Sequence, residues 1–160
     1  MIIEISIKAY LKDYLVHLHG GQHPIPLTKR TALGKMVYQY SEKVPPDCMY
    51  RPGDISDRRK LILEVGFLGN NNELRKDPDY YFYIPRDKQR IIEDIFDTVF
   101  KELFHEYIDQ NREDFEKRIK DSIEKFCDDR DIAFDNITYE ALKKSYYRYR
   151  KKQSQEIIKS

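Results

Sequence analysis

The sequence predicts an α+β fold, in which N-terminal helices and an antiparallel β-hairpin pack on a long helix and a helical unit follows. Apolar, β-branched runs predict strands in the first half of the chain, and a broad apolar stripe predicts the long helix over residues 87–110. Beyond that helix only helical patterns follow. We therefore expect an α+β domain over residues 1–110 and a helical unit over residues 111–160.

The first two predicted elements are a strand and a helix. Residues 1–7 are β-branched and alternate weakly between apolar and polar positions, which predicts a strand. Residues 8–18 carry tyrosine and leucine at helical spacing, which predicts a helix. Gly20 and Gly21 predict the end of this helix, because glycine adopts positive φ without strain.

A second helix is predicted after a proline-containing link. Pro24 and Pro26 favour extended backbone, and Thr28 is a suitable N-cap for a helix that runs to about Glu42. Further prolines between residues 45 and 53 predict an irregular loop.

Two apolar segments predict the hairpin. Residues 60–68, KLILEVGFL, have the clearest strand pattern, and residues 79–84, DYYFYI, have an aromatic one. Residues 69–72 between them are glycine and asparagine, which tolerate positive φ. We therefore expect the two strands to pair as an antiparallel hairpin with a long tip.

The long helix is expected to begin near Asp87, because Pro85 ends the aromatic strand. Its apolar side chains cover a sector too broad for a two-stranded coiled coil, which indicates packing against the hairpin and the N-terminal helices. These side chains are Ile91, Ile92, Ile95, Phe96, Val99, Phe100, Leu103, Phe104, Tyr107 and Ile108.

The C-terminal unit is predicted as a helix, a polar turn and a basic helix. Residues 112–126 have apolar anchors at helical spacing, and the sequence leaves open whether this helix continues the preceding one or breaks near Asn111. Residues 128–136 form the turn. Thr138 is the expected N-cap of the last helix, which we place at residues 138–152.

The last helix has two different faces. Tyr139, Leu142, Tyr146 and Tyr149 recur three, four and three residues apart and predict a buried face. The rest of the circumference holds cations and a phenol, which suit a polyanion such as DNA or RNA. We predict nucleic-acid contacts from Lys143, Lys144, Tyr147, Arg148, Arg150, Lys151 and Lys152. A solvated amphipathic helix without a ligand is the competing interpretation.

The distribution of charge indicates a positive field that is local. The chain has 29 basic and 28 acidic residues, so its net charge carries no argument. Residues 109–136 hold ten Asp or Glu against six Lys or Arg, whereas residues 137–160 hold two against seven. A helix, a turn and a basic helix follow the order found in helix-turn-helix proteins. The turn is longer than usual and the cations come late in the helix, which favours backbone contacts over base reading.

Composition argues against a membrane or secreted protein. Charged residues make up 36% of the chain and the mean hydropathy is −0.78, and no apolar run approaches the ~20 residues that a membrane span needs. The first residues lack a basic region and a cleavage site, so we expect no signal peptide and a cytoplasmic protein. Cys48 and Cys127 lie far apart and are expected to be reduced thiols.

No metal or cofactor site is predicted. His17, His19, His23 and Cys48 are chemically suitable ligands for zinc, but no ligand spacing supports such a site. Capping and surface roles are the favoured interpretation of these side chains.

No catalytic residues are predicted either. Asp54 and Glu64 flank a strand, but the lysine that follows the acidic strand residue in restriction-type nucleases is missing. Cys127 lies beside two aspartates, which disfavour a thiolate. We therefore expect a protein that is not an enzyme.

Two segments carry a family resemblance. Near the N-terminus these are IKAYLKDYLVHLHG followed by PLTKRTALGK, and at the C-terminus RIKDSIEKFCDDRDIAFDNITYEALKKSYYRYRKK, which is similar to a family pattern of a helix ending in an aromatic pair, a D-I turn and a terminal Y-R-Y-R-K helix. With these motifs the chain resembles small uncharacterised proteins carried by bacterial prophages and mobile elements. The resemblance implies a DNA-associated role in a mobile element, without a defined activity.

We interpret the sequence as a non-enzymatic nucleic-acid-binding protein, with DNA favoured over RNA, that acts as a regulator or as a replication or packaging accessory factor. The alternative is a protein-interaction or assembly module, in which the tyrosine-rich helix docks on an acidic partner surface. Salt dependence distinguishes the two, because phosphate contacts make affinity fall steeply with salt concentration. The sequence leaves the target sequence and homo-oligomerisation open.

Overall fold

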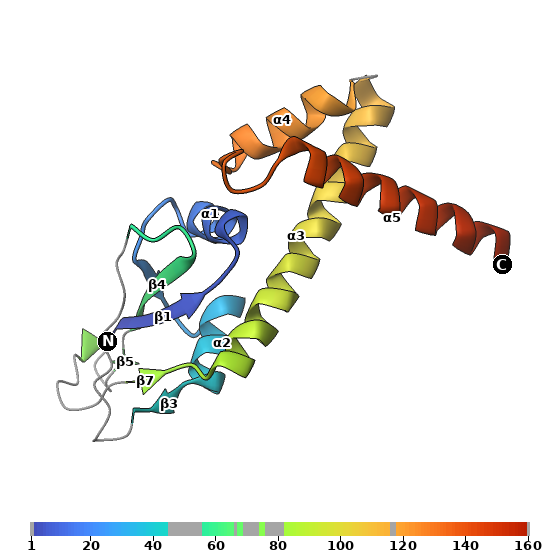
Figure 1. Ribbon diagram of the computed structural model, residues 1–160. Helices are drawn as coiled ribbons and strands as arrows, with labels where there is room; N and C mark the ends of the chain where they lie inside the picture. The colour runs from blue at the N-terminus through green and yellow to red at the C-terminus, as the bar shows by residue number, and fades with distance from the viewer. Residues whose placement is uncertain are drawn as a thin grey trace. The chain divides into compact units, whose positions relative to one another are not determined.

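The computed structural model describes residues 2–44, 56–65, 67–68, 74–75, 82–115 and 118–159. Within these residues the protein is an α+β arrangement of helices and short strands, as the sequence predicted (Figure 1). The chain divides into two compact units, Met1–Ile95 and Phe96–Ser160. The division falls inside the long helix α3, Arg86–Phe115, whereas the sequence suggested a boundary after residue 110.

A three-stranded sheet forms the centre of the first unit. In spatial order its strands are β1 (Ile2–Ser6), β4 (Lys60–Val65) and β2 (Ile25–Leu27). The central strand, β4, is antiparallel to β1 and parallel to β2. Leu61, Ile62 and Leu63 point alternately to opposite faces of the sheet and are all buried, so both faces of the central strand are covered.

The proline-containing link that the sequence predicted is an edge strand in the structure. Pro26 lies in β2, which pairs only with β4 among the described strands. Edge strands tolerate proline, because the side without a neighbour needs no N–H donor. Extended backbone was therefore predicted correctly, and the parallel pairing was not.

The first helix, α1 (Ala9–Leu18), confirms the sequence prediction. It packs through Leu11, Tyr14 and Leu15, which are buried. Gly20 and Gly21 follow it with φ of 80° and 77°, the left-handed conformation that glycine adopts without strain.

The second helix, α2 (Ala32–Tyr40), is capped by Thr31 and not by Thr28. The Thr31 hydroxyl oxygen accepts a hydrogen bond from the Gly34 backbone N–H at 3.0 Å. The Thr28 carbonyl instead accepts the Thr31 N–H, which makes a turn before the helix. That carbonyl also lies so close to Gly34 that a side chain at position 34 would collide with it.

The hairpin predicted between residues 60–68 and 79–84 has a different pairing in the structure. An antiparallel pair is present, but it joins β5 (Phe67–Leu68) to β6 (Leu74–Arg75). The described part of the aromatic strand is β7 (Phe82–Tyr83), which pairs with β3 (Glu42–Lys43). β4 is occupied on both sides by β1 and β2, so the aromatic strand pairs elsewhere. Residues 79–81 and the predicted loop over residues 45–53 lie outside the described residues.

The first turns of α3 are tied to the sheet of the first unit. The Gln89 side chain accepts the backbone N–H of Ser6 and donates to the carbonyl of Ile84, both at 2.8 Å. The Glu93 carboxylate accepts the backbone N–H of Lys8 at 2.8 Å. These bonds hold the end of β1 and the start of α1 against the long helix.

The apolar stripe predicted on α3 divides into two rows. One row is buried and comprises Ile92, Phe96, Phe100, Phe104 and Ile108. The other row is exposed and comprises Ile91, Ile95, Val99 and Leu103. The expectation that the whole stripe packs inside was therefore wrong for the second row.

The second unit contains the C-terminal half of α3, α4 (Ile119–Asp129) and α5 (Tyr139–Lys159). α3 continues through Asn111, and α4 starts as a separate helix, which answers the question that the sequence left open. The Phe126 ring of α4 meets three rings of α3 edge-on, at centroid distances of 5.6, 5.1 and 5.3 Å. The three α3 rings are, in that order, those of Phe100, Phe104 and Tyr107. Figure 1 shows α5 crossing the C-terminal half of α3 and extending beyond it.

Candidate nucleic-acid interface

The inner face of α5 is the aromatic face that the sequence predicted. Leu142 and Tyr146 are buried, and Tyr139 and Tyr149 are partly buried. The spacing of three, four and three residues places them on one side of the helix. α5 is therefore anchored along its first three turns, and its other side is available to solvent.

Asp109 on α3 holds this aromatic face in place. The Tyr146 hydroxyl donates to Asp109 Oδ1 at 2.7 Å, and the Tyr149 hydroxyl donates to Oδ2 at 3.1 Å. Arg150 Nη1 lies 3.7 Å from Oδ1 and forms an ion pair with the same carboxylate. Hydrogen bonds to a charged group are stronger than those between neutral groups, so Asp109 fixes both tyrosines together.

His105, one turn before Asp109 on α3, adds two further contacts with α5. Its ring stacks on the Tyr149 ring at a centroid distance of 4.5 Å and an interplanar angle of 15°. Its Nε2 lies 2.9 Å from Ser145 Oγ, within hydrogen-bond distance. Burial lowers the pKa of His105, and burial together with the Asp109 hydrogen bond raises the pKa of Tyr149.

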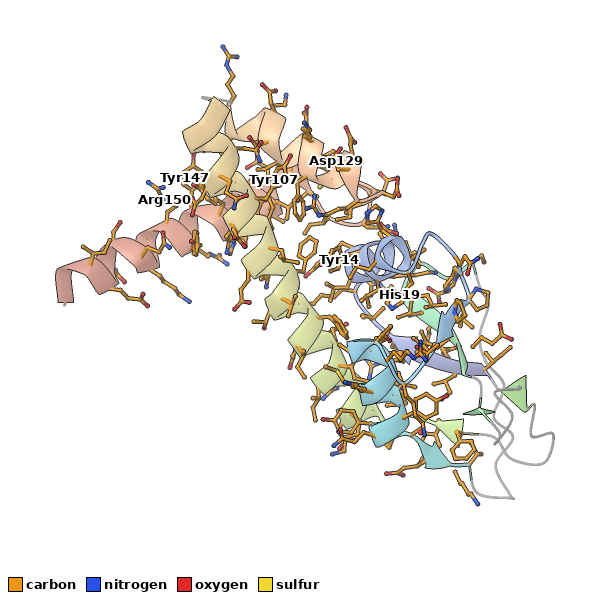
Figure 2. The ribbon with its side chains drawn as sticks, turned by 180° about the vertical axis from the view of Figure 1, so that it is seen from behind. Tyr14, His19, Tyr107, Asp129, Tyr147 and Arg150 are labelled. Atoms are coloured by element: carbon orange, nitrogen blue, oxygen red, sulfur yellow. The ribbon has the colours of Figure 1, made fainter. Side chains whose placement is uncertain are left out.

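The outer face of α5 carries the predicted charges in one cluster. Lys144, Tyr147, Arg148 and Lys151 follow one another at positions i, i+3, i+4 and i+7, and all four are exposed. No hydrogen bond or ion pair holds the side chains of Lys144, Arg148 or Lys151 to the rest of the described chain. We call these four residues the outer cluster. Figure 2 labels Tyr147 on α5.

The remaining predicted residues take different positions. Lys152 is exposed and lies beside the outer cluster. Lys143 is partly buried, with its ammonium nitrogen 5.7 Å from the centroid of the Tyr139 ring. Arg150 is turned toward Asp109, as described above. Five of the seven predicted residues therefore face solvent together, and two are engaged within the second unit.

The C-terminal part of α5 extends farther than the sequence indicated. The helix reaches Lys159, whereas the prediction ended at residue 152. Every residue from position 151 to position 157 is exposed. Lys151 and Lys152 thus lie on a stretch of helix that a ligand can approach from several sides.

Neither a known protein family nor a curated protein matched this chain, and no solved structure matched its fold. The interface is therefore argued from its own geometry. The resemblance to prophage and mobile-element proteins stays a prediction.

The connection between α4 and α5 is folded. The Arg130 guanidinium carbon lies 4.0 Å from the Phe126 ring centroid and 5.2 Å from that of Tyr107. Asp131 adopts a φ of 55°, and Thr138 caps α5 by accepting the Ala141 N–H at 3.1 Å. The predicted order of helix, turn and basic helix is present, with Thr138 as the predicted cap.

The histidine set does not form a metal cluster among the described residues. His23 Nε2 accepts the backbone N–H of Ile62 at 3.0 Å, and His19 Nδ1 lies 2.7 Å from the carbonyl of Leu15. Burial and the nearby Lys12 charge lower the pKa of His23. Two of these histidines therefore bond to the backbone, and Cys48 lies outside the described residues.

The other residues considered for catalysis were Asp54, Glu64 and Cys127. Glu64 is exposed on β4, and Asp54 lies outside the described residues. Cys127 is a buried free thiol, and burial with the neighbouring Asp128 raises its pKa to about 11. A thiol with that pKa stays protonated near neutral pH and is a poor nucleophile.

None of the described helices combines the length and the apolar character needed to cross a membrane.

The sequence missed the residues that orient α5. His105 and Asp109 lie one turn apart on α3, and Tyr146 and Tyr149 are nearly one turn apart on α5. This matched spacing is compatible with contact between two helix faces, but it does not identify which two helices meet.

Proposed function

We propose that the second unit binds nucleic acid through the outer cluster of α5, with DNA as the favoured polymer and with no catalytic step. The observation that carries the proposal is the exposure of three cations and a phenol at i, i+3, i+4 and i+7. These side chains make one positive strip along the helix. Phosphate groups are the ligands that such a strip attracts most strongly.

The proposal places the main contacts on the nucleic-acid backbone. Lys151 and Lys152 lie on the freely exposed end of α5, which can lie along a strand without interference from the rest of the unit. Lysine is a point charge that neutralises phosphate without reading sequence. A regulatory or accessory role in a mobile element follows from the sequence resemblance and belongs to the same proposal.

The experiment is a charge reversal of the outer cluster, K144E/R148E/K151E, measured by gel shift and by fluorescence anisotropy at several salt concentrations. Affinity should be lost, because the cations that neutralise phosphates become anions. Any residual binding should have a shallower log–log salt slope, because each phosphate contact contributes about −0.9 to that slope on duplex DNA. The circular dichroism spectrum should be unchanged, since these side chains are exposed and project away from Leu142.

The matched control reverses three exposed cations of the first unit, K35E/R58E/R90E, and changes the net charge by the same amount. The control should retain most of the affinity. Equal loss in both variants would mean that net charge alone drives binding. Unchanged binding in the outer-cluster variant, or a shallow salt slope in the wild type, would overturn the proposal in favour of a protein-interaction module.

A further inference from the structure

Tyr147 has a different environment from the other tyrosines of α5. Tyr146 and Tyr149 both donate to Asp109, and Tyr139 has the Lys143 ammonium over its ring. Tyr147 remains 50% exposed. Its ring centroid lies 6.2 Å from that of Tyr146, so it rests beside a fixed ring. A planar aromatic surface is thus presented to solvent from a rigid helix.

Cations lie before and after this ring on the same helix face. Lys144 precedes Tyr147 by three residues, Lys151 follows it by four, and Arg148 is adjacent in sequence and in the outer cluster. Residues three and four apart on a helix are neighbours, with Cβ atoms about 5–6 Å apart. A nucleotide whose base met the Tyr147 ring would therefore have its flanking phosphates within reach of these cations.

A duplex can use the cations but not the ring. In a double helix each base is stacked between its neighbours, so a protein reaches only base edges, sugars and phosphates. In a single strand the base faces are accessible, and aromatic side chains stack on them. An exposed ring between cations is the combination that single-strand binding uses.

We propose that Tyr147 stacks on an unpaired base, so that the preferred ligand of the outer cluster is single-stranded nucleic acid. This inference rests on the proposed nucleic-acid function and specifies its substrate class. The cations hold the backbone of the strand, and Tyr147 supplies the discrimination against duplex.

Two substitutions at position 147 separate stacking from hydrogen bonding. Tyr147→Phe keeps the aromatic face and removes the hydroxyl, whereas Tyr147→Leu removes the aromatic face and keeps a smaller apolar side chain that favours the helix. The probes are a fluorescein-labelled 20-nucleotide DNA of mixed sequence and the duplex of the same sequence, both measured by anisotropy at equal salt.

The wild type should bind the single strand more tightly than the duplex. Tyr147→Phe should bind both probes within about twofold of the wild type, because the stacking surface is intact. Tyr147→Leu should weaken single-strand binding by about tenfold or more, in the range expected for loss of one stacked base. Its duplex affinity should stay within about twofold.

Two results would overturn the inference. If Tyr147→Phe loses as much as Tyr147→Leu, the hydroxyl contacts phosphate and no base is stacked. If the wild type binds the duplex as tightly as the single strand, and both variants also bind the two probes equally, the Tyr147 ring has no role in selecting single strands. The K144E/R148E/K151E variant keeps the two ideas apart, because failure of that variant to affect either probe contradicts the proposed function itself.

Discussion

At the scale of single residues, one carboxylate determines how α5 presents its charges. Asp109 accepts hydrogen bonds from the hydroxyls of Tyr146 and Tyr149. Rotation of α5 about its axis would break both bonds. The outer cluster lies on the other side of the helix, so Asp109 acts as a positioning residue for side chains that it does not touch.

Acid should destabilise the protein in part through His105. Burial lowers the pKa of His105 from its ordinary value of 6.5, and Lys101 acts in the same direction, while Asp109 opposes the shift. The unfolded chain therefore binds a proton more readily than the folded chain. The stability that neutral His105 contributes is present above about pH 6.5 and is lost as the pH falls through the folded-state pKa. Urea denaturation at a series of pH values should show this loss.

His105→Gln is the variant that isolates this contribution. It should flatten the pH dependence of the free energy of unfolding below about pH 6.5, because the titrating group is gone. His23→Gln serves as the comparison, since the pKa of His23 is also lowered. This variant should remove the part of the pH dependence that His23 contributes and keep the part that His105 contributes. A wild-type pH profile in the His105 variant, or an NMR titration midpoint above 6.5, would contradict the prediction.

The sequence predicted the two faces of α5 but not what the inner face meets. Leu142, Tyr146 and Tyr149 could be assigned from their spacing alone, because helical periodicity is a local property. The bond between Tyr146 and Asp109 joins residues 37 positions apart, and no local pattern encodes which helix supplies the acceptor. Periodicity therefore identifies a face, and the partner depends on tertiary packing.

At the scale of elements, α3 shows that two adjacent rows of one apolar stripe can differ in burial. Phe100 is 1% exposed and its ring meets the Phe126 ring, whereas Val99 in the adjacent row is 39% exposed. The two residues follow each other in sequence and have similar predicted roles. They offer a direct comparison of buried and exposed positions on the same helix.

Phe100→Ala should lower the free energy of unfolding by about 3–5 kcal/mol, because it removes a buried aromatic side chain and leaves a cavity. Val99→Ala should change it by less than about 0.5 kcal/mol, since surface substitutions are usually near neutral. Urea denaturation followed by circular dichroism measures both. If both substitutions lowered the free energy of unfolding equally, the two rows of α3 would not differ in burial.

Element boundaries and pairings were predicted unevenly, for physical reasons. The end of α1 before Gly20 was clear, because the backbone there has a positive φ, which favours glycine. The cap of α2 was placed at Thr28, three residues before Thr31, because both threonines satisfy the same local rule and a turn decides between them. The strand at residues 60–68 was recognised, but its neighbours in space come from distant parts of the chain, and strand pairing of that kind is not local.

At the scale of the whole molecule, α3 contributes to both compact units. Its first turns bond to the end of β1 through Gln89 and to the start of α1 through Glu93, and its later turns carry His105 and Asp109. The sequence suggested a boundary after residue 110, because the helix was assigned entirely to the first domain. The residues that hold α5 lie before that point.

Fragments of the chain should therefore fold differently according to where they begin. A fragment of residues 96–160 keeps His105, Asp109 and the rings around Phe126, so it should be helical and unfold cooperatively. A fragment of residues 111–160 leaves Tyr146 and Tyr149 without their partners, and short fragments bury too little surface to compensate. It should lose cooperative unfolding and hydrogen-exchange protection.

Circular dichroism melts and amide hydrogen exchange of the two fragments provide the test. Asp109→Ala in the longer fragment is the control, and it should lower the melting temperature without abolishing the fold. A cooperative melt of the 111–160 fragment at the temperature of the longer one would show that α3 is dispensable for this unit.

The position of the junction within a helix has an evolutionary consequence. Each residue added to a helix rotates everything beyond it by about 100°. An insertion or deletion between His105 and Asp109 would turn one of these side chains away from α5 and break the paired contacts. A length change between Ile95 and Phe96 would leave the internal contacts of each unit in phase. Among natural variants of this sequence, changes in the length of α3 should therefore accumulate near that junction and avoid the single turn from position 105 to position 109.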